Sequence, residues 1–521
     1  MKHLAAGAAV AALAAALVPT TAVAQDAEVD RVHVVHLTVD SLHPSEVGPD
    51  TPVLQSLRDA GTWYEQARSV MSAETLPNHV AIATGTYPGT NGIPGNDGRA
   101  AAGDTEPSSP DLGLPGLLQA DSFVTAIETA CPDLRTVTVF SKNYVHFIFE
   151  GEADRDFPQP QFNIPGSGHA PDISTVGFIL EELAQEQPDY LFANLGDVDR
   201  AGHVDPTGSA GIVAGGRRAA LQQTDTLIGT VRAALEANGM WDRTVLVISS
   251  DHSMDYALPE SGNVDIEGAL EADPRTQGRF FVSNNGGAAL VYLLDPDAVD
   301  RDVVLLAARE VLSGLDGVAE ALYREPNPLE PGQDLDAVHP AWRLAGTDRA
   351  GEIFVYVEEG RKAGSLRANP IPGNHGHAVT RHITALISGG WDGLAAPSSV
   401  APSDPDAVDV VDDTEALPEQ AEQVDFAPTF GWLLGVPDPG LARAGAPQWE
   451  GVVRDEAFAR QPTGVCVEAA GGGTDGGPTT GGSEGTAGGG APSLPATGGG
   501  LAGALAAVAA SLLVRRRGAR R

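Results

Sequence analysis

The chain has 521 residues, of which 70 are acidic and 32 are basic, so its formal net charge at pH 7 is −38. This acidic surplus argues against nonspecific attraction to a phosphate backbone, and we expect no nucleic-acid partner. The length exceeds one average domain, but a single large α/β domain with terminal tails accounts for it.

Residues 1–24 have the features of a secretory signal peptide. Lys2 and His3 form a short basic start, an apolar run follows, and the small residues 22–24 precede Gln25. We therefore expect an exported protein. Export permits a disulfide between Cys131 and Cys466, but the sequence leaves both a disulfide and two free thiols open.

Residues 32–449 alternate short β-rich runs with longer helical ones. Continuous apolar and β-branched runs predict buried strands at residues 32–40, 135–141, 188–195, 243–252 and 383–390. Residues 217–239 carry Leu221, Ile228, Val231 and Leu235 at helical spacing and stop at Gly239, which predicts a helix. The alternation predicts an α/β fold with a doubly wound, mostly parallel central sheet flanked by helices. The acidic residues 396–423 are interpreted as a surface loop.

The C-terminal region predicts a tether and an anchor. Residues 469–493 are rich in Gly, Thr and Ser and lack apolar periodicity, which is typical of a flexible linker. "LPATG" at Leu494 to Gly498 is followed by an apolar stretch at 501–514 and a basic end, so residues 494–521 resemble a cell-wall sorting signal of the LPxTG type. The resemblance implies sortase as a partner and wall attachment through Thr497. The alternative is a transmembrane anchor, for which 501–514 is short.

Polar residues follow several of the predicted strands. Asp40 closes the first strand, Asp199 and His203 follow residues 188–195, and Asp251 and His252 close residues 243–252. Such residues collect at one edge of a parallel sheet, where open α/β folds bind ligands. A fourth group, "GNHGH" at residues 373–377, follows the apolar stretch 351–360. Carboxylates and imidazoles together are the ligand set of zinc and similar ions.

In this order the motifs resemble the alkaline phosphatase superfamily, most closely its nucleotide pyrophosphatase/phosphodiesterase branch. The likeness runs from about residue 32 to 451 and rests on "VD" at 39–40, "TLPNHVAIATGTYPGTNGI" with Asn96 behind it, "DRAGH", "SDH" and "NHG". It implies an alkaline-phosphatase-like catalytic domain over residues 25–468. It also implies two zinc ions, the first held by Asp40, Asp251, His252 and Thr75, the second by Asp199, His203 and His375.

The resemblance implies that Thr75 is the nucleophile and that Asn96 hydrogen-bonds a nonbridging phosphoryl oxygen. Metal coordination can make a threonine alkoxide available near neutral pH, and the run after Thr75 predicts a helix whose N-terminus favours developing negative charge. The expected reaction is hydrolysis of phosphodiester or pyrophosphate bonds in a small phosphorylated substrate, through a phosphothreonine.

Several alternatives stay open on the sequence. Asp197 competes with Asp199, although only Asp199 has the Asp-x-x-x-His spacing, and His377 competes with His375. Phosphomonoesterase and phosphonoacetate-hydrolase relatives share the same ligand types; a monoester dianion asks for an additional cation, for which Arg68 and Arg99 are near in sequence. A sulfatase is disfavoured because "TLPNH" lacks the Cys or Ser and the Arg of that motif. A wall-displayed binding protein without activity is the alternative from another class.

Overall fold

The computed structural model describes residues 31–100, 112–114, 116–149, 151–157, 169–204, 215–257, 262–364, 373–401, 420–440, 447–463 and 466. The predicted signal peptide, linker and sorting signal lie outside these residues, as does most of the predicted acidic loop. Within the described part of the chain, no helix is both long and apolar enough to span a membrane.

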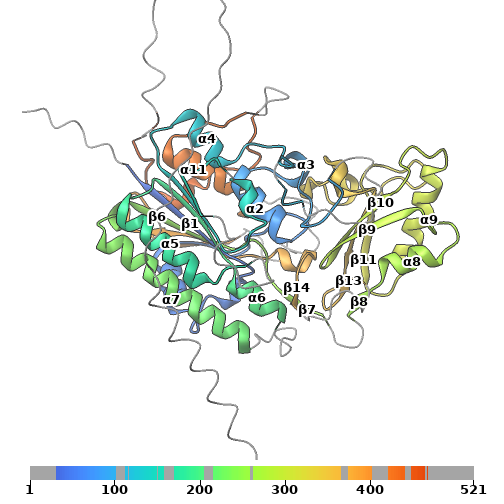
Figure 1. Ribbon diagram of the computed structural model, residues 1–521, viewed down its shortest axis with the longest axis horizontal. Coiled ribbons are helices and arrows are strands. Elements are labelled where there is room, and N and C mark those ends of the chain that lie inside the picture. Colours follow the sequence, from blue (N-terminus) through green and yellow to red (C-terminus); the bar gives the residue numbers. More distant parts are fainter. Residues whose placement is uncertain are drawn as a thin grey trace, which may run out of the picture. The chain divides into compact units, whose positions relative to one another are not determined.

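The central sheet contains eight strands among the described residues (Figure 1). Its order is β16 (Ser398–Val400), β2 (Thr62–Tyr64), β15 (Ala385–Gly389), β6 (Thr244–Ser249), β1 (His33–Val39), β5 (Tyr190–Leu195), β3 (Thr136–Phe140) and β4 (Arg155–Phe157). The strands from β6 to β4 are mutually parallel, whereas β15 runs antiparallel to both β6 and β2. The predicted mostly parallel α/β sheet is therefore confirmed, with an antiparallel strand toward one edge.

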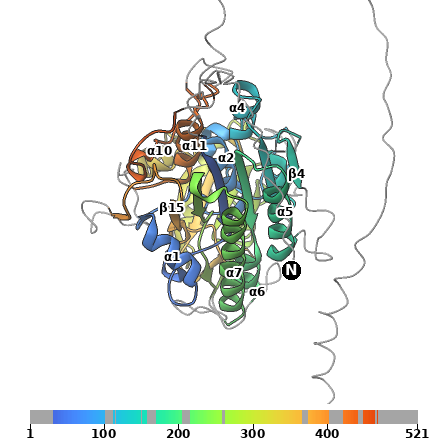
Figure 2. The same cartoon turned by 90° about the vertical axis from the view of Figure 1, so that its left-hand side faces the viewer.

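Helices cover both faces of this sheet (Figures 1 and 2). Alternate residues of β1 point to opposite faces, so Val34 packs in one core and Val35 and Leu37 in the other, which explains the continuous apolar run. The core with Val34 includes side chains of α2 (Thr75–Thr84), α4 (Phe123–Ala130) and α11 (Phe426–Leu434). The core with Val35 includes side chains of α1 (Pro52–Ala60), α5 (Asp172–Gln185), α6 (Asp197–Val204) and α7 (Gly215–Ala237), the last of which matches the predicted helix at 217–239.

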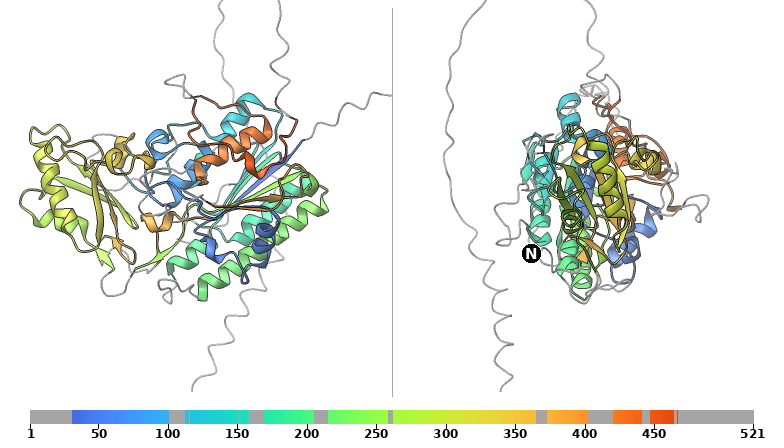
Figure 3. Two further views of the ribbon diagram at one scale, coloured as in Figure 1. Left: turned by 180° about the vertical axis from the view of Figure 1, so that it is seen from behind. Right: turned by 90° about the vertical axis from the view of Figure 1, so that its right-hand side faces the viewer.

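A second sheet, which the sequence patterns did not predict, lies beside the first (Figures 1 and 3). Its order is β11 (Val318–Tyr323), β12 (Ile353–Val357), β10 (Ala288–Leu293) and β9 (Phe280–Asn285), all antiparallel. Apolar side chains of α8 (Ile266–Ala272) and α9 (Arg301–Ser313) cover one face. The apolar stretch 351–360, which precedes "GNHGH" in the sequence, contains β12 of this second sheet and no strand of the central sheet.

Short paired strands and two short α-helices lie outside these two sheets. β13 (Lys362–Ala363) pairs with β8 (Asn263–Val264), and β14 (Gly373–Asn374) pairs with β7 (Asp255–Tyr256). The short helices are α3 (Pro88–Asn91) and α10 (Leu335–Val338).

A disulfide joins Cys131, at the end of α4, to Cys466. The two residues are 335 positions apart, so the bond restricts a very long loop in the unfolded chain.

We expect the double variant Cys131→Ser, Cys466→Ser to lose about 2–5 kcal/mol of unfolding free energy. Urea denaturation measures this loss, and wild-type protein unfolded with a reductant should give the same midpoint as the double variant. Equal midpoints for the variant and the oxidised wild type would contradict a stabilising disulfide.

Candidate active site

The three aspartates predicted from strand ends meet at the carboxyl edge of the central sheet. β1 lies between β5 and β6, and Asp40 follows β1 while Asp251 follows β6. Asp199 lies in the first turn of α6, directly after β5. All three are buried, and the Ser41 amide donates to Asp251 Oδ1 at 2.9 Å. Parallel pairing of three neighbouring strands therefore brings these carboxylates together.

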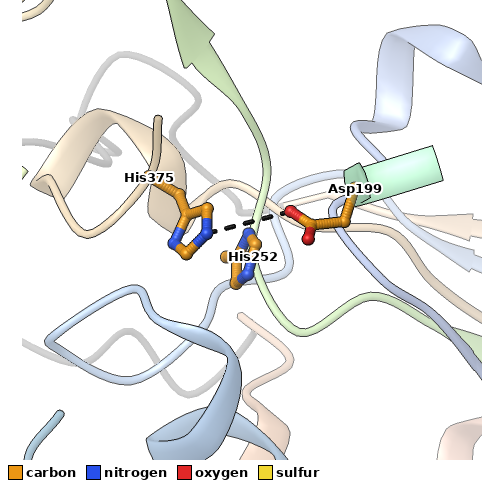
Figure 4. Close-up of side chains that lie close together, drawn as sticks. All are labelled: Asp199, His252 and His375. Carbon is orange, nitrogen blue, oxygen red and sulfur yellow. Dashed lines mark ion pairs between the residues drawn. The ribbon is translucent and has the colours of Figure 1, made fainter. Parts of the chain in front are cut away.

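Three of the predicted histidines join the aspartates. His203 lies one turn after Asp199 on α6, with Nε2 3.3 Å from Asp199 Oδ1. His375 Nε2 is 3.1 Å from His203 Nε2, and the rings of His252 and His375 stack with centroids 3.7 Å apart. Figure 4 shows His252 and His375 beside Asp199. His375 reaches the site because β14 lies against α6, where the Gly373 carbonyl oxygen contacts His203 Nδ1 at 2.8 Å.

The side chains at this edge suit divalent metal ions. Asp40, Asp251 and His252 can present ligand atoms within 4.8 Å of one another, and so can Asp199, His252 and His375. Buried oxygens of the three aspartates, Asp40 Oδ1, Asp199 Oδ1 and Asp251 Oδ2, accept no hydrogen bond from the described residues. Burial, together with repulsion from His375, lowers the pKa of His252 to about 3, which keeps its imidazole in the neutral form that binds metals. Buried carboxylate oxygens without donors cost free energy unless a cation offsets it.

Thr75 is the first residue of α2, and Glu74, not Thr75, is the N-cap. Its hydroxyl oxygen Oγ1 is 3.2 Å from His252 Nε2 and 3.2 Å from Lys142 Nζ. The side chain is buried at the start of a ten-residue helix, where the backbone dipoles favour negative charge. The predicted helix N-terminus is thus confirmed, and Thr75 lies beside the predicted ligands.

Lys142 is a site residue that the sequence reasoning missed. Its ammonium is 2.8 Å from Asp40 Oδ2 and 2.8 Å from Asp199 Oδ2, in addition to its contact with Thr75. Burial alone would lower the pKa of Lys142, but the two carboxylates hold it well above its ordinary value. Lys142 comes two residues after β3, so the same rule about polar residues at strand ends could have found it.

Asn96 is held in a fixed orientation next to Thr75. Its Oδ1 accepts a 2.7 Å hydrogen bond from the Leu76 amide, and its Nδ2 donates to the buried carboxylate of Glu74. Burial would raise the pKa of Glu74, but His375, 3.3 Å away, and the other imidazoles hold it below its ordinary value. Asn285 of β9 clamps the next residue, since its carboxamide bonds both the amide and the carbonyl oxygen of Asp97 at 3.0 Å.

Asp197 and His377, the alternatives to Asp199 and His375, bond to groups outside the cluster. Asp197 accepts hydrogen bonds from His169 and from the Asp172 amide, each at 3.0 Å. His377 Nε2 lies 2.8 Å from the Arg361 carbonyl oxygen and 3.2 Å from Asn374 Nδ2. This geometry favours Asp199 and His375 as the members of the cluster.

Neither arginine weighed as an additional cation reaches the cluster. Arg68 pairs with Glu422 at 2.6 Å, and Arg99 donates to the Leu293 carbonyl oxygen while lying over the Tyr292 ring. The cation beside Thr75 is Lys142.

A cavity of about 210 Å³ opens onto the cluster. The central domain contributes Thr75, Asn96 and Asp199 to its wall, and the region of the second sheet contributes Asn284 and Lys362. This volume is smaller than the roughly 300–1,000 Å³ of most small-molecule sites, so the cavity suits a small ligand group. The second sheet therefore supplies one wall of the candidate active site.

Known proteins resemble this chain in sequence. Residues 34–378 match the family described as type I phosphodiesterase/nucleotide pyrophosphatase. Mouse ectonucleotide pyrophosphatase/phosphodiesterase family member 1 is 26% identical over 210 residues, 39% of this chain but only 22% of the mouse protein. Mouse bis(5'-adenosyl)-triphosphatase enpp4 is 23% identical over 220 residues, 39% of this chain and 43% of that protein. The matched stretch thus spans less than half the length of either relative.

Solved structures share the fold. Murine ectonucleotide pyrophosphatase/phosphodiesterase 5 superposes with a TM-score of 0.59 at 15% identity, covering 78% of this chain and 95% of that chain. Phosphonoacetate hydrolase from Sinorhizobium meliloti 1021, in complex with phosphonoformate, gives a TM-score of 0.55 at 17% identity, covering 76% and 94%. Because the family match extends over most of the chain, this protein belongs to the type I phosphodiesterase/nucleotide pyrophosphatase family.

Proposed function

We propose that the protein is an exported phosphoesterase that uses Thr75 as nucleophile and two zinc ions to hydrolyse phosphodiester or pyrophosphate bonds. The observation that carries this proposal is the position of the Thr75 hydroxyl. It lies at the N-terminus of α2, 3.2 Å from His252 Nε2, beside aspartates whose buried oxygens lack donors among the described residues.

The residues divide into two ligand sets. Asp40, Asp251, His252 and Thr75 would hold one ion, and Asp199, His203 and His375 would hold the other. When bound, such ions stabilise negative charge on the attacking and leaving oxygens and lower the pKa of coordinated hydroxyl groups. The short distances from His203 Nε2 to Asp199 Oδ1 and to His375 Nε2, 3.3 and 3.1 Å, support the second set.

In the proposed reaction, Thr75 loses its proton to solvent and its Oγ1 forms a bond to phosphorus while the bond to the leaving-group oxygen breaks. That oxygen takes up a proton, and water then cleaves the phosphothreonine, which restores the threonine and releases the second product. The Lys142 ammonium, 3.2 Å from Oγ1, favours the deprotonated hydroxyl. Asn96 uses one amide N–H on Glu74 and keeps a second N–H for a nonbridging phosphoryl oxygen.

The family and the relatives' names support a phosphodiester or pyrophosphate substrate. Murine ectonucleotide pyrophosphatase/phosphodiesterase 5 has also been solved as an inactive threonine-to-alanine variant in complex with AMP. A second candidate, hydrolysis of phosphomonoesters or phosphonates, is favoured by Lys142, because a buried ammonium next to Thr75 is the additional cation that a dianionic group requires.

Localisation belongs to the same proposal. A signal peptide at 1–24, a linker at 469–493 and a sorting signal at 494–521 would leave the catalytic domain, 25–468, attached to the cell wall. The Cys131–Cys466 disulfide supports an oxidising compartment. Release of the protein by wall digestion in wild type, and its loss from that fraction in Thr497→Ala, would test the anchor. Retention in the membrane fraction instead would favour the membrane anchor.

The first test compares hydrolysis of a chromogenic phosphodiester with that of the matching monoester by zinc-loaded protein. We expect the diester to be preferred and a chelator to remove activity, which added zinc restores. Preference for the monoester would support the second candidate. Failure to hydrolyse either ester, together with fewer than about one bound metal ion per chain, would indicate an inactive binding protein.

A further inference from the structure

Lysine is rare in this chain and is concentrated at the candidate active site. Only three lysines, Lys2, Lys142 and Lys362, occur among the 32 basic residues. Lys2 lies in the predicted signal peptide, and both remaining lysines are buried at the candidate active site. Lys142 contacts the Thr75 hydroxyl and two aspartates, whereas Lys362 has no such partners. The proposed hydrolysis therefore assigns no role to Lys362.

Lys362 is a buried cation that faces the cavity. It lies on β13, is 4% exposed, and lines the 210 Å³ cavity together with Thr75. No described residue makes a hydrogen bond or an ion pair with its ammonium group. Burial lowers the pKa of Lys362 to about 8, with Glu74 acting in the opposite direction, so the group is still positively charged at neutral pH. A buried, unpaired ammonium is costly unless an anion offsets the lost hydration.

Asn284 of β9 supplies an amide to the same wall. Its carboxamide forms no hydrogen bond with the described residues, in contrast to the neighbouring Asn285, which is fully used in holding Asp97. The backbone around both residues is tied together, because the Ala363 amide donates to the Gly286 carbonyl oxygen at 2.9 Å. The ammonium of Lys362 and the amide of Asn284 are thus two unused donors on one rigid wall.

Apart from Lys362, the charged residues of this cavity are mainly acidic. Glu74, Asp97 and Asp199 all contribute to its lining, and Asp199 would be a metal ligand in the proposed function. Glu74 and Asp97 would repel any negatively charged group of the substrate other than the reacting phosphoryl group. The positive charge of Lys362 on β13 reverses this repulsion at the part of the wall that also contains Asn284 of β9. A substrate whose only anionic group is the one that reacts does not need the positive charge of Lys362 on this wall.

We propose that Lys362, assisted by Asn284, forms a subsite for a second anionic group of the substrate, a carboxylate or a phosphate, separate from the phosphoryl group attacked by Thr75. This inference rests on the proposed function and adds to it a substrate class: phosphoryl compounds with two anionic groups. Substrates with one anionic group react at the same site without this contact.

The test measures binding in zinc-loaded Thr75→Ala protein, in which turnover does not consume the probes. Methylphosphonate has one anionic group, phosphonoacetate adds a carboxylate, and pyrophosphate adds a phosphate. We expect phosphonoacetate or pyrophosphate to bind about 10- to 100-fold more tightly than methylphosphonate, the range of one charge-assisted hydrogen bond. Whichever of the two binds more tightly identifies the second group as carboxylate or phosphate.

Variants assign the preference to Lys362. Lys362→Gln should erase the difference between the probes, and Lys362→Arg, which keeps the charge, should retain most of it. Arg361→Gln is the matched control, because it removes a positive charge from the adjacent residue, whose side chain pairs with Asp316 at 3.0 Å and does not line the cavity. Thermal unfolding of each variant verifies that it is folded.

Two results would overturn the subsite: equal affinity for all three probes, or an undiminished preference in folded Lys362→Gln protein. Failure of the proposed function is a separate observation. It would appear as absence of hydrolysis of the chromogenic esters by protein that retains both Thr75 and Lys362, whatever the relative affinities of the probes.

Discussion

Replacing Thr75 by alanine is expected to lower kcat for phosphoester hydrolysis by about 10³-fold or more, because the variant has no oxygen to attack phosphorus. Metal content and fold should change little, since Asp40, Asp251 and His252 remain and Glu74 still occupies the N-cap. Steady-state kinetics together with elemental analysis of the purified variant measures both quantities.

Thr84→Ala is the matched control for this prediction. Thr84 is at the other end of α2, and its hydroxyl donates to the Val80 carbonyl oxygen at 2.8 Å, so the variant removes the same atoms from the same helix outside the cavity. It should keep near wild-type turnover. Retained activity in Thr75→Ala would remove Thr75 from the role of nucleophile.

Lys142→Met, on the same assay, tests whether the ammonium assists Thr75. In this variant we expect a rise in the pH at which kcat reaches half of its maximum, because the Thr75 hydroxyl loses a neighbouring positive charge. A lower kcat with an unchanged pH profile would mean that Lys142 acts only through packing.

Replacing His375 by alanine should lower the bound metal by about one ion per chain and reduce turnover with it, because a three-residue ligand set rarely tolerates the loss of one ligand. His203→Ala should have the same effect, since His203 Nε2 lies 3.1 Å from His375 Nε2. Elemental analysis after zinc loading and removal of free metal gives the stoichiometry.

His377→Ala provides the comparison, because His377 is a buried imidazole two residues away that contacts the Arg361 carbonyl oxygen and not the aspartates of the cluster. It should retain full metal content in protein that is still folded by thermal unfolding. Loss of metal from His377→Ala but not from His375→Ala would exchange the two histidines in the ligand set.

The mostly parallel fold and the candidate cluster were predictable from the sequence because both depend on local patterns. Buried strands appear as continuous apolar runs, and parallel pairing carries the residue after each strand to one edge. Asp40, Asp251 and Asp199 each follow such a run, so their meeting required knowledge of strand direction but not of side-chain packing. The Asp199 to His203 spacing likewise places both residues on one helical face.

Only the tertiary structure decided that His375, Glu74 and Lys362 reach the candidate active site. His375 is held by pairing of β14 with β7 and by the turn between β9 and β10, where the Gly287 amide donates to the His375 carbonyl oxygen at 2.5 Å. The apolar stretch that precedes "GNHGH" in the sequence contains β12 of the second sheet, so sequence position did not show which elements hold His375. Lys362 lies on β13, which pairs in parallel with β8 from a much earlier part of the chain, and such long-range contacts leave no periodic signal in the residues that make them. Local sequence therefore determined the strands and the residues at their ends, and packing between the two sheets decided which further groups reach Thr75.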